Sequence, residues 1–205
     1  MNIRGVEIQL HGIQDAFSNS IKDTGDFFEA EILDYMAQHH GTQKIILDIG
    51  ANIGNHTLFF ANFFKYWAIV GFEPIPDNFV LWAKNTAPYE KVTGFQAAVG
   101  NTVGYTQMTA HEQNMGTSGT DINGLIKVPM VTIDSMNFQN VTLMKIDVEN
   151  DEPKVLKGAE KTIKRDHPLI LIEDWEQKYA SLLPGYELEK EWPNHYTYLY
   201  RWKNA

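Results

Sequence analysis

Short apolar runs recur along the chain, and small, polar or acidic residues follow each of them. Runs of this kind are typical of strands buried on both faces of a parallel sheet. Helical spacing of apolar residues fills most of the intervals between them, so the pattern predicts a doubly wound α/β fold. The core strands are predicted at residues 44–48, 68–72, 92–99, 141–146 and 169–172.

Helices accompany these strands. The first predicted helix starts with Asp26-Phe27-Phe28-Glu29, which resembles a capping box, and Gly41 stops it. The last has an acidic start and a basic end, which suits the helix dipole. The helices are predicted at residues 26–40, 57–64, 77–87 and 151–165. Weaker patterns predict strands at 105–108, 126–131, 186–191 and 196–202, the last two as an antiparallel edge pair, and an extended N-terminal segment at 3–10.

Composition narrows the class of protein. With 205 residues, 43% of them hydrophobic, and no internal repeat or linker, we expect a single domain over residues 1–205, with an N-terminal extension at 1–43 and the core at 44–205. The 17 basic residues against 26 acidic ones give a net charge of −9, which disfavours nucleic acid as a partner. The chain has no cysteine, which excludes disulfides and thiolate chemistry. It starts without a signal-peptide pattern and has no apolar run of membrane-spanning length, so we expect a cytoplasmic protein.

The stretch Leu47-Asp48-Ile49-Gly50-Ala51-Asn52-Ile53-Gly54 joins the end of a buried strand to a glycine turn and the start of a helix. This succession forms the nucleotide-binding corner of doubly wound folds. The dinucleotide fingerprint would need a further glycine at Asn55, where this chain has none. The spacing therefore disfavours NAD and favours a ligand without a pyrophosphate, such as S-adenosylmethionine. A tight turn that binds no ligand is the alternative.

Acidic residues follow the core strands, at the edge of the sheet where α/β folds bind ligands. Glu73 comes 25 residues after Asp48, near the offset of the acid that holds ribose hydroxyls in nucleotide-binding folds. A solvated turn acid is the alternative for Glu73. Asp147 and Glu149 alternate on an expected extended strand end, which would turn both to one side. They are candidates for binding hydroxyls, holding a divalent cation or acting as a base, or they serve only the helix dipole.

The histidines offer little metal chemistry. Seven are scattered along the chain without an H-x-x-x-H pair, so a histidine metal site is not predicted. His56 follows Gly54 and is a candidate for a base or a substrate contact. The chain has neither a G-x-S-x-G elbow nor a Walker A motif, so hydrolase and NTPase interpretations lose their usual support.

Taken together, these motifs resemble the FkbM family of S-adenosylmethionine-dependent methyltransferases. The resemblance covers about residues 44–173 and rests on the order and spacing of the motifs. Asn150 departs from the glycine that is usual in the family, and the N-terminal forty residues match no part of it. The matching pieces are 47–54, Gly71-Phe72-Glu73-Pro74 with Pro76 and Asn78, Asn85, 97–100, 131–134, the loop around Gly116 and Ser118, 144–149 and 155–159.

The resemblance implies a Rossmann-like sheet of seven strands, mostly parallel, with an antiparallel C-terminal hairpin and helices on both faces. It also implies that the glycine turn holds the methionine end of the cofactor, Glu73 the ribose, and residues 96–98 the adenine. Members of the family generally methylate hydroxyl groups of sugars or secondary metabolites. The expected cofactor-binding residues are Asp48, Gly50, Asn52, Gly54, Glu73, Pro74, Asn78, Gln96, Ala97, Ala98 and Asp147.

We therefore expect an S-adenosylmethionine-dependent O-methyltransferase that acts on a small hydroxylated molecule without a metal. Asp147 is expected to take the hydroxyl proton, with Glu149 and His56 in reserve. A polar loop at 114–119 is expected to close over the acceptor. The rival interpretations are an N-methyltransferase, an RNA methyltransferase, which the net charge disfavours, and a non-catalytic cofactor-binding domain. The sequence does not indicate an oligomeric state.

Overall fold

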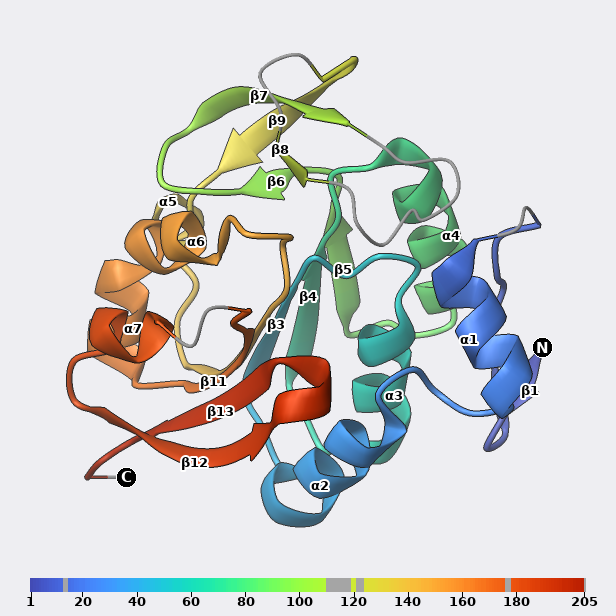
Figure 1. Cartoon of the computed structure of the whole chain (residues 1–205), viewed down its shortest axis with the longest axis horizontal. Helices are drawn as coiled ribbons and strands as arrows, with labels where there is room; N and C mark the ends of the chain where they lie inside the picture. The colour runs from blue at the N-terminus through green and yellow to red at the C-terminus, as the bar shows by residue number, and fades with distance from the viewer. Residues whose placement is uncertain (13–14, 110–118, 121–123, 176–177, 205) are drawn as a thin grey trace.

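A seven-stranded sheet forms the centre of the computed structural model, which describes residues 1–12, 15–109, 119–120, 124–175 and 178–204 (Figure 1). The strand order is β12-β13-β11-β10-β3-β4-β5. The strands are β3 (Ile45–Ile49), β4 (Ala68–Phe72), β5 (Val92–Phe95), β10 (Val141–Ile146), β11 (Leu169–Glu173), β12 (Tyr186–Trp192) and β13 (Thr197–Trp202). The first five run parallel, and β12 and β13 form an antiparallel hairpin at one edge. The predicted sheet is thus confirmed.

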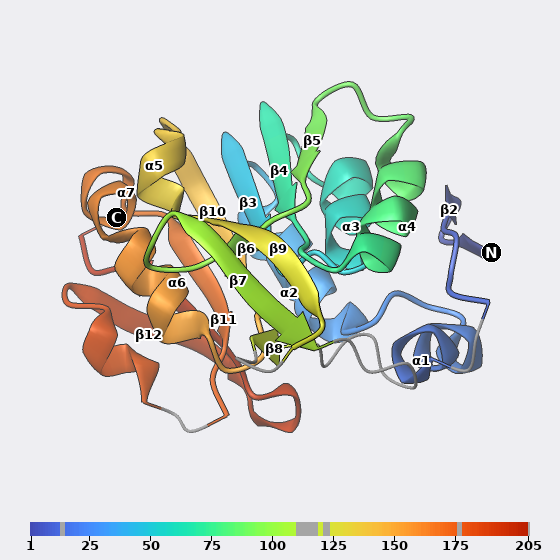
Figure 2. The same cartoon turned by 90° about the horizontal axis from the view of Figure 1, so that it is seen from above.

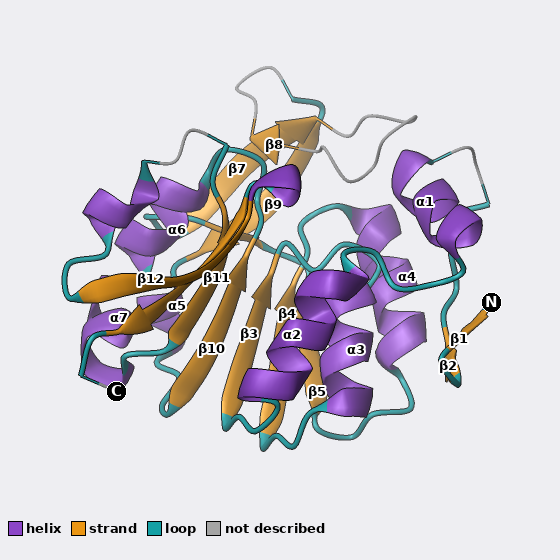
Figure 3. Ribbon diagram, turned by 60° about the horizontal axis from the view of Figure 1, so that its bottom comes forward, coloured by secondary structure: helices purple, strands orange, loops and turns teal. Residues whose placement is uncertain are grey.

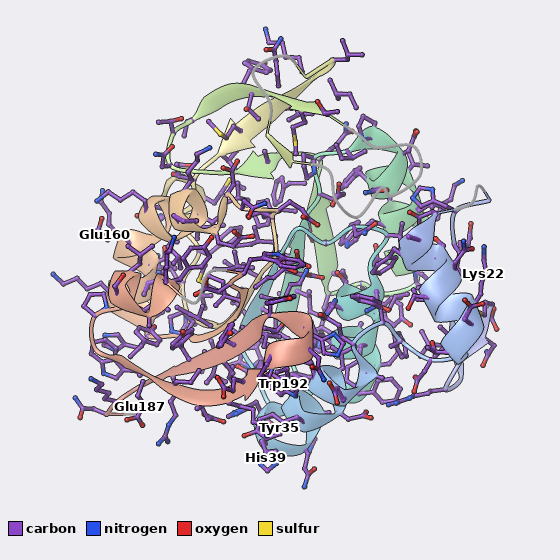
Figure 4. The ribbon with its side chains drawn as sticks, in the orientation of Figure 1. Lys22, Tyr35, His39, Glu160, Glu187 and Trp192 are labelled. Atoms are coloured by element: carbon purple, nitrogen blue, oxygen red, sulfur yellow. The ribbon has the colours of Figure 1, made fainter. Side chains whose placement is uncertain are left out.

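Helices cover both faces of this sheet (Figure 3). Alternate residues of each strand supply two separate apolar clusters, as the two-residue period of a strand requires. In β3, Ile46 belongs to the cluster that includes Leu33 and Leu58, and Leu47 belongs to the cluster that includes Val155. The helices are α2 (Ala30–His40), α3 (Asn55–Phe63), α4 (Pro76–Thr86), α5 (Ile133–Met136), α6 (Glu152–Gly158) and α7 (Glu160–Asp166). Tyr35 of α2 also packs on Trp192 of the hairpin, with 5.3 Å between ring centroids (Figure 4).

A second, four-stranded sheet lies beside the carboxyl ends of the main strands (Figure 2). It consists of β6 (Ala98–Val99), β7 (Gly104–Thr109), β8 (Gly119–Thr120) and β9 (Ile126–Val131). The single strand predicted at 92–99 is therefore wrong. The chain leaves the main sheet after Phe95, where a hydrogen bond from the Ala97 N–H to the Phe95 carbonyl closes a three-residue turn around Gln96. Residues 114–118 of the expected loop at 114–119 lie outside the described residues.

The N-terminal region contains elements that the sequence pattern did not predict correctly. A short hairpin, β1 (Asn2–Ile3) and β2 (Val6–Glu7), precedes the helix α1 (Ala16–Thr24), which was not predicted. The capping box at Asp26 does not form, because α2 begins only at Ala30 and Glu29 has a φ of 58°. Asp26 instead pairs with Arg4, and Asn55 exchanges two hydrogen bonds with the backbone of Phe28.

The predicted helix at 151–165 is two helices that meet at Ala159. Gly158 packs against the carbonyl of Gly100 so closely that a side chain would collide with it. Asp134 accepts hydrogen bonds from the backbone N–H groups of Lys161 and Thr162 in the first turn of α7. These bonds satisfy N–H groups that have no partner within the helix. None of the helices in the described ranges has both the length and the apolar composition that crossing a membrane requires.

Candidate active site

A pocket of about 370 Å³ opens at the carboxyl ends of the parallel strands. The turns after β3, β4, β10 and β11 form its floor, which is the location that open α/β sheets use for ligands. Other regions complete the wall, among them the start of α1, the segment before α2, the starts of α3 and α4, the turn between β12 and β13, and the second sheet. The wall residues from these regions include Ala16, Phe17, Ala98, Val99, Met108, Asn194, His195 and Tyr196.

The glycine turn after β3 is shaped by close backbone contacts. Gly50 has a φ of 79°, and a Cβ there would collide with the carbonyl oxygen of Asp147. The N–H groups of Gly50 and Ala51 donate to the carbonyl of Phe72 at 3.0 and 2.9 Å, which fixes the turn on β4. Asn52 follows with a φ of 49°, and its buried Oδ1 has no hydrogen-bond partner in the described part of the chain. The turn therefore presents one open acceptor.

Glu73 stands at the end of β4, 5% exposed. Its Oε2 accepts a hydrogen bond from the Asn52 N–H at 2.8 Å, and its Oε1 accepts from the Ile75 N–H at 2.9 Å and from Asn78 Nδ2 at 3.4 Å. Burial raises the pKa of Glu73 to about 7, although these donors favour the ionised form. Because each carboxylate oxygen has two lone pairs, the group can accept further hydrogen bonds from a ligand.

A buried lysine joins the ends of β3 and β10. Lys145 Nζ donates to the carbonyl of Gly50 at 3.0 Å and to Asp147 Oδ2 at 3.1 Å, and it lies 3.7 Å from Asp48 Oδ1. Burial disfavours its charge, but the neighbouring carboxylates of Asp147 and Asp48 outweigh burial and raise the pKa of Lys145. Asp48 also accepts a hydrogen bond from Thr57 Oγ1 at 2.5 Å. Lys145 therefore stays charged and compensates two carboxylates.

Further acids surround the open end of the pocket. Glu149 has a φ of 58°, so the extended strand end expected from Asp147 to Glu149 is wrong, yet both residues line the pocket. Burial and the charge of Asp147 raise the pKa of Glu149 to about 7. The same two causes raise the pKa of Glu173 to about 9, and its buried Oε2 has no hydrogen-bond partner in the described ranges. Across those ranges, no three histidine, aspartate or glutamate side chains are arranged to hold a metal ion.

Two histidines approach one carboxylate on the opposite wall. His56 Nε2 lies 3.1 Å from Glu29 Oε2, without the alignment of a hydrogen bond, and His56 Nδ1 lies 3.4 Å from Asn55 Nδ2. His195 Nδ1 lies 3.6 Å from Glu29 Oε1. Beside them, the rings of Trp175 and Tyr196 stack with 4.1 Å between their centroids. Glu29 thus bridges the start of α3 and the turn of the C-terminal hairpin.

Most of the residues expected in the site are brought together by the fold. Those that line the pocket are Gly50, Asn52, His56, Glu73, Pro74, Asn78, Ala97, Ala98, Asp147 and Glu149. Three others do not line it. Asp48 is buried below the turn, Gly54 packs against Trp82 as the N-cap of α3, and Gln96 is exposed.

Several pocket residues were not singled out from the sequence. Lys145 could have been recognised from the sequence, because it lies inside an apolar strand. Lysine is almost never fully buried without a partner, so its position indicates a nearby carboxylate. Glu29, Trp175, His195 and Tyr196 gave no such indication. They come from three separate parts of the chain and meet at the pocket because the C-terminal hairpin, whose Trp192 packs on Tyr35, lies beside α2.

Solved structures share the fold of this chain. It matches a crystal structure of methyltransferase FkbM from Methylobacillus flagellatus KT with 18% identity and a TM-score of 0.60, covering 78% of this chain and 44% of that one. The chain thus spans less than half the length of that relative. It matches S-adenosylhomocysteine-bound PaMTH1, a methyltransferase of Podospora anserina, with 13% identity, a TM-score of 0.52 and coverage of 94% and 90%.

A third structure with this fold is a candidate rRNA-methylase from Clostridium thermocellum, with 10% identity, a TM-score of 0.51 and coverage of 83% and 92%. No curated protein matches the chain. The sequence model of the methyltransferase FkbM domain matches residues 48–189, which is more than half of the chain and includes the floor of the pocket from Ile49 to Glu173. The chain therefore belongs to the FkbM methyltransferase domain family.

Proposed function

We propose that this chain binds S-adenosylmethionine in the pocket and transfers its methyl group to a hydroxyl of a small molecule. The observation that carries the proposal is the position of Glu73. Its buried carboxylate stands at the end of β4, is held by the backbone of Asn52 in the glycine turn, and faces the pocket. A carboxylate in this place can accept from both hydroxyls of a ribose. Family membership and the S-adenosylhomocysteine in the Podospora structure support the choice of cofactor.

The residues present fit the cofactor. The tight turn at Gly50 allows the methionine end to approach the backbone, and the open Oδ1 of Asn52 is an acceptor for its ammonium group. Glu73 is assigned to the ribose. The adenine is assigned to the mostly apolar wall of Phe72, 97–99 and Met108, while Asp48 and Gly54 support the turn from below. The exposed Gln96 is assigned to the rim of the adenine end.

When bound, the cofactor supplies an electrophilic methyl group. The chain must hold an acceptor oxygen in line with that group, and such alignment can supply up to about 7–11 kcal/mol. It must also accept the hydroxyl proton. We assign this role to Glu149, because a carboxyl whose pKa is raised to about 7 is matched to proton transfer near neutral pH.

The other candidates for the base have competing contacts. Asp147 has one oxygen bound to Lys145, and its charge helps to raise the pKa of Glu149, so we assign it to tuning Glu149. Both ring nitrogens of His56 face protein groups, Asn55 and Glu29, so we assign His56 to holding Glu29 at the wall. Neither role needs a metal, since Lys145 already compensates Asp147.

An amine acceptor is the rival that the geometry favours most. Glu29, Asp147 and Glu149 all line the pocket, where a cationic amine would gain from their negative field. RNA is a further rival in view of the Clostridium structure, although the net charge of −9 works against it.

One experiment separates these possibilities. The purified chain is incubated with S-adenosylmethionine labelled in the methyl group and, separately, with a metabolite extract rich in hydroxyl compounds, with small amines and with RNA. Mass spectrometry then locates the label. Label on an oxygen of a small molecule is the expected result. Label on nitrogen or RNA would overturn the assigned acceptor, and cofactor binding without any transfer would favour a non-catalytic domain.

A further inference from the structure

Two aromatic side chains at the pocket have stacked rings that remain exposed to solvent. Trp175 follows β11 and Tyr196 directly precedes β13, with an angle of 26° between their rings. Trp175 is 50% exposed and Tyr196 is 38% exposed, and both line the pocket. Large exposed apolar rings that lie together indicate a surface that a ligand can cover.

The backbone and a neighbouring acid hold these two rings in place. The Asp174 N–H donates to the Tyr196 carbonyl at 2.7 Å, which connects the end of β11 to the turn of the hairpin. The side chain of Trp175 also forms a hydrogen bond with Glu173, the last residue of β11. The two rings therefore form a preformed surface, which we call the Trp175–Tyr196 platform.

The pocket beside this platform has an excess of acidic side chains. Lys145 is the one lysine or arginine among the described residues that line it, and its charge already compensates Asp147 and the buried Asp48. A cationic ligand would balance the excess. The acids that line the pocket are Glu29, which two histidines approach, Asp151, which pairs with Lys154, and Glu73, Asp147, Glu149 and Glu173.

Glu173 shows how strongly this environment attracts a positive charge. Burial raises its pKa to about 9, and the negative charges of Asp147 and Glu149 add to the effect. The carboxyl therefore holds a proton at neutral pH, and a cation that binds beside it can replace that proton. The methyl transfer described above gives Glu173 no role, and its buried Oε2 has no hydrogen-bond partner in the described ranges.

We propose that the acceptor carries a cationic group besides its hydroxyl, and that this group binds on the Trp175–Tyr196 platform beside Glu173. The proposal rests on the methyl transfer to a hydroxyl proposed above and narrows the class of the acceptor. The face of an indole ring attracts cations, and the acids of the pocket add to that attraction. A protonated amine has no lone pair with which to attack a methyl group. The cation is therefore the group that is recognised, and the hydroxyl is the group that is methylated.

The test compares choline with its neutral carbon analogue 3,3-dimethylbutan-1-ol, which has nearly the same shape and the same hydroxyl. Because S-adenosylmethionine carries its own positive charge on sulfur, calorimetry first measures the binding of two unreactive cofactor analogues. These are S-adenosylhomocysteine, which lacks that charge, and sinefungin, which has an ammonium group in its place. The two probes are then titrated into each complex.

We expect the wild type to bind choline roughly 10-fold more tightly than the neutral analogue in both complexes, the scale of a partly desolvated cation–π contact. Trp175→Leu removes the aromatic face and should reduce this preference to about 1- to 3-fold, whereas Trp175→Phe should retain most of it. Trp67→Leu is the matched control and should match the wild type. Trp67 is 59% exposed and directly precedes β4, at the opposite end of that strand from the pocket.

Glu173 should add a pH dependence to choline binding. Because binding displaces its proton, the affinity for choline should rise from pH 8 to pH 9, and the affinity for the neutral analogue should not. In this range Glu149, whose pKa is about 7, is already ionised. Glu173→Gln should remove most of the rise. The titratable groups around Glu173 are Asp147, Glu149 and Glu152, together with Glu29, His56 and Lys145 along a small cavity.

Equal affinity for the two probes, binding of neither, or an unchanged preference in Trp175→Leu would overturn the cation site, while binding of the analogues upholds the proposed cofactor. A preference seen with S-adenosylhomocysteine but not with sinefungin would place choline at the sulfonium position and overturn the site as well. A choline affinity that stays constant from pH 8 to pH 9 would remove Glu173 from it. Failure of the wild type to bind either cofactor analogue would instead overturn the proposed function, and this proposal with it.

Discussion

Lys145 Nζ lies 3.1 Å from Asp147 Oδ2, at the place where the end of β10 meets the glycine turn. The same ammonium group donates to the carbonyl of Gly50. A single buried cation therefore connects the turn assigned to the cofactor with the acids assigned to the acceptor. A buried ion pair adds little to stability by itself, but removing one partner leaves an uncompensated charge in the core.

Replacing Lys145 with methionine should thus destabilise the fold strongly. Asp48 is fully buried and would retain only its hydrogen bond from Thr57 among the contacts described above, so we expect Lys145→Met to lower the free energy of unfolding by about 3–5 kcal/mol. Lys154→Met is the matched control, because Lys154 pairs with Asp151 but its own side chain is half exposed. Its loss should cost at most about 1 kcal/mol. Urea unfolding of both variants measures the difference, and equal costs would refute the role of Lys145.

Glu173 should make stability fall as the pH rises. Burial, reinforced by Asp147, raises its pKa to about 9, well above the value near 4.3 in an unfolded chain. Between these values the folded chain holds a proton that the unfolded chain releases, so folding is favoured at low pH and loses this contribution towards pH 9. Glu173→Gln should therefore be more stable than the wild type at pH 8.5, and the gain should vanish near pH 5.

Urea unfolding at these two pH values tests the titration of Glu173. Glu187→Gln is the control, because Glu187 lies on the edge strand β12 in a surface pair with Arg201 (Figure 4). It should leave the pH dependence unchanged. A Glu173→Gln variant whose stability follows the wild type at both pH values would show that Glu173 titrates normally.

The central sheet could be predicted because a short stretch of neighbouring residues is enough to identify each of its parallel strands. Strands such as β3 and β4 are short apolar runs, and the acid that follows β4 lands at the ligand edge simply because parallel strands end there. Glu73 was found in this way. The glycine turn was also readable, since backbone that approaches a neighbouring strand as closely as Gly50 does excludes other residues.

The wall of the pocket could not be predicted, because it depends on tertiary contacts. Asp26 and Glu29 have the spacing of a capping box, but Arg4 takes Asp26 into an ion pair and Glu29 turns towards two histidines instead. The break of the expected strand at Gln96 has the same origin. The residue pattern of a strand continues through residues 98 and 99. The structure breaks the strand, because these residues pair with β9 in the second sheet.

Substituting Gly50 should test the close approach of the turn to β10. Gly50→Ala would combine a positive φ with a collision against the Asp147 carbonyl, so we expect it to cost about 2–5 kcal/mol of stability and to abolish binding of S-adenosylhomocysteine. Gly5→Ala is the matched control. Gly5 has a φ of 88° and open space around it, so only the backbone strain of about 1–2 kcal/mol should appear. Equal costs in thermal unfolding would mean that β10 moves aside easily.

Cofactor choice can be tested at Glu73. Calorimetry should show binding of S-adenosylmethionine and S-adenosylhomocysteine and no comparable binding of NAD, since the turn lacks the third glycine of a dinucleotide site. Glu73→Ala should weaken binding of both by about 1.5–3 kcal/mol, the scale of hydrogen bonds to a charged group. Tighter binding of NAD would refute the cofactor assignment, and unchanged affinity in Glu73→Ala would leave Glu73 as a turn acid only.

The acids at the open end of the pocket should govern the pH dependence of turnover. Glu149 must be ionised to accept a proton, and its pKa is raised to about 7, so kcat should rise with pH through about 7. Glu149→Gln should lose about 10²- to 10⁴-fold in kcat and retain cofactor affinity. Asp147→Asn removes the charge that helps to raise the pKa of Glu149, so the rise in kcat should move to lower pH. A chelator such as EDTA should change neither profile, because Lys145 already compensates Asp147.

Each alternative for the base leaves a different pattern in these kinetics. If Asp147 were the base, Asp147→Asn would abolish turnover and Glu149→Gln would stay active. No shift in the pH dependence of kcat would then be measured for Asp147→Asn. If a divalent cation held the acceptor, EDTA would stop turnover and Mg²⁺ would restore it. His56→Gln keeps the contact to Glu29 but cannot act as a base at neutral pH, so activity in this variant would exclude His56. The displaced profile of Asp147→Asn is therefore the decisive measurement, since among these schemes it follows only if Glu149 takes the proton and Asp147 sets its pKa.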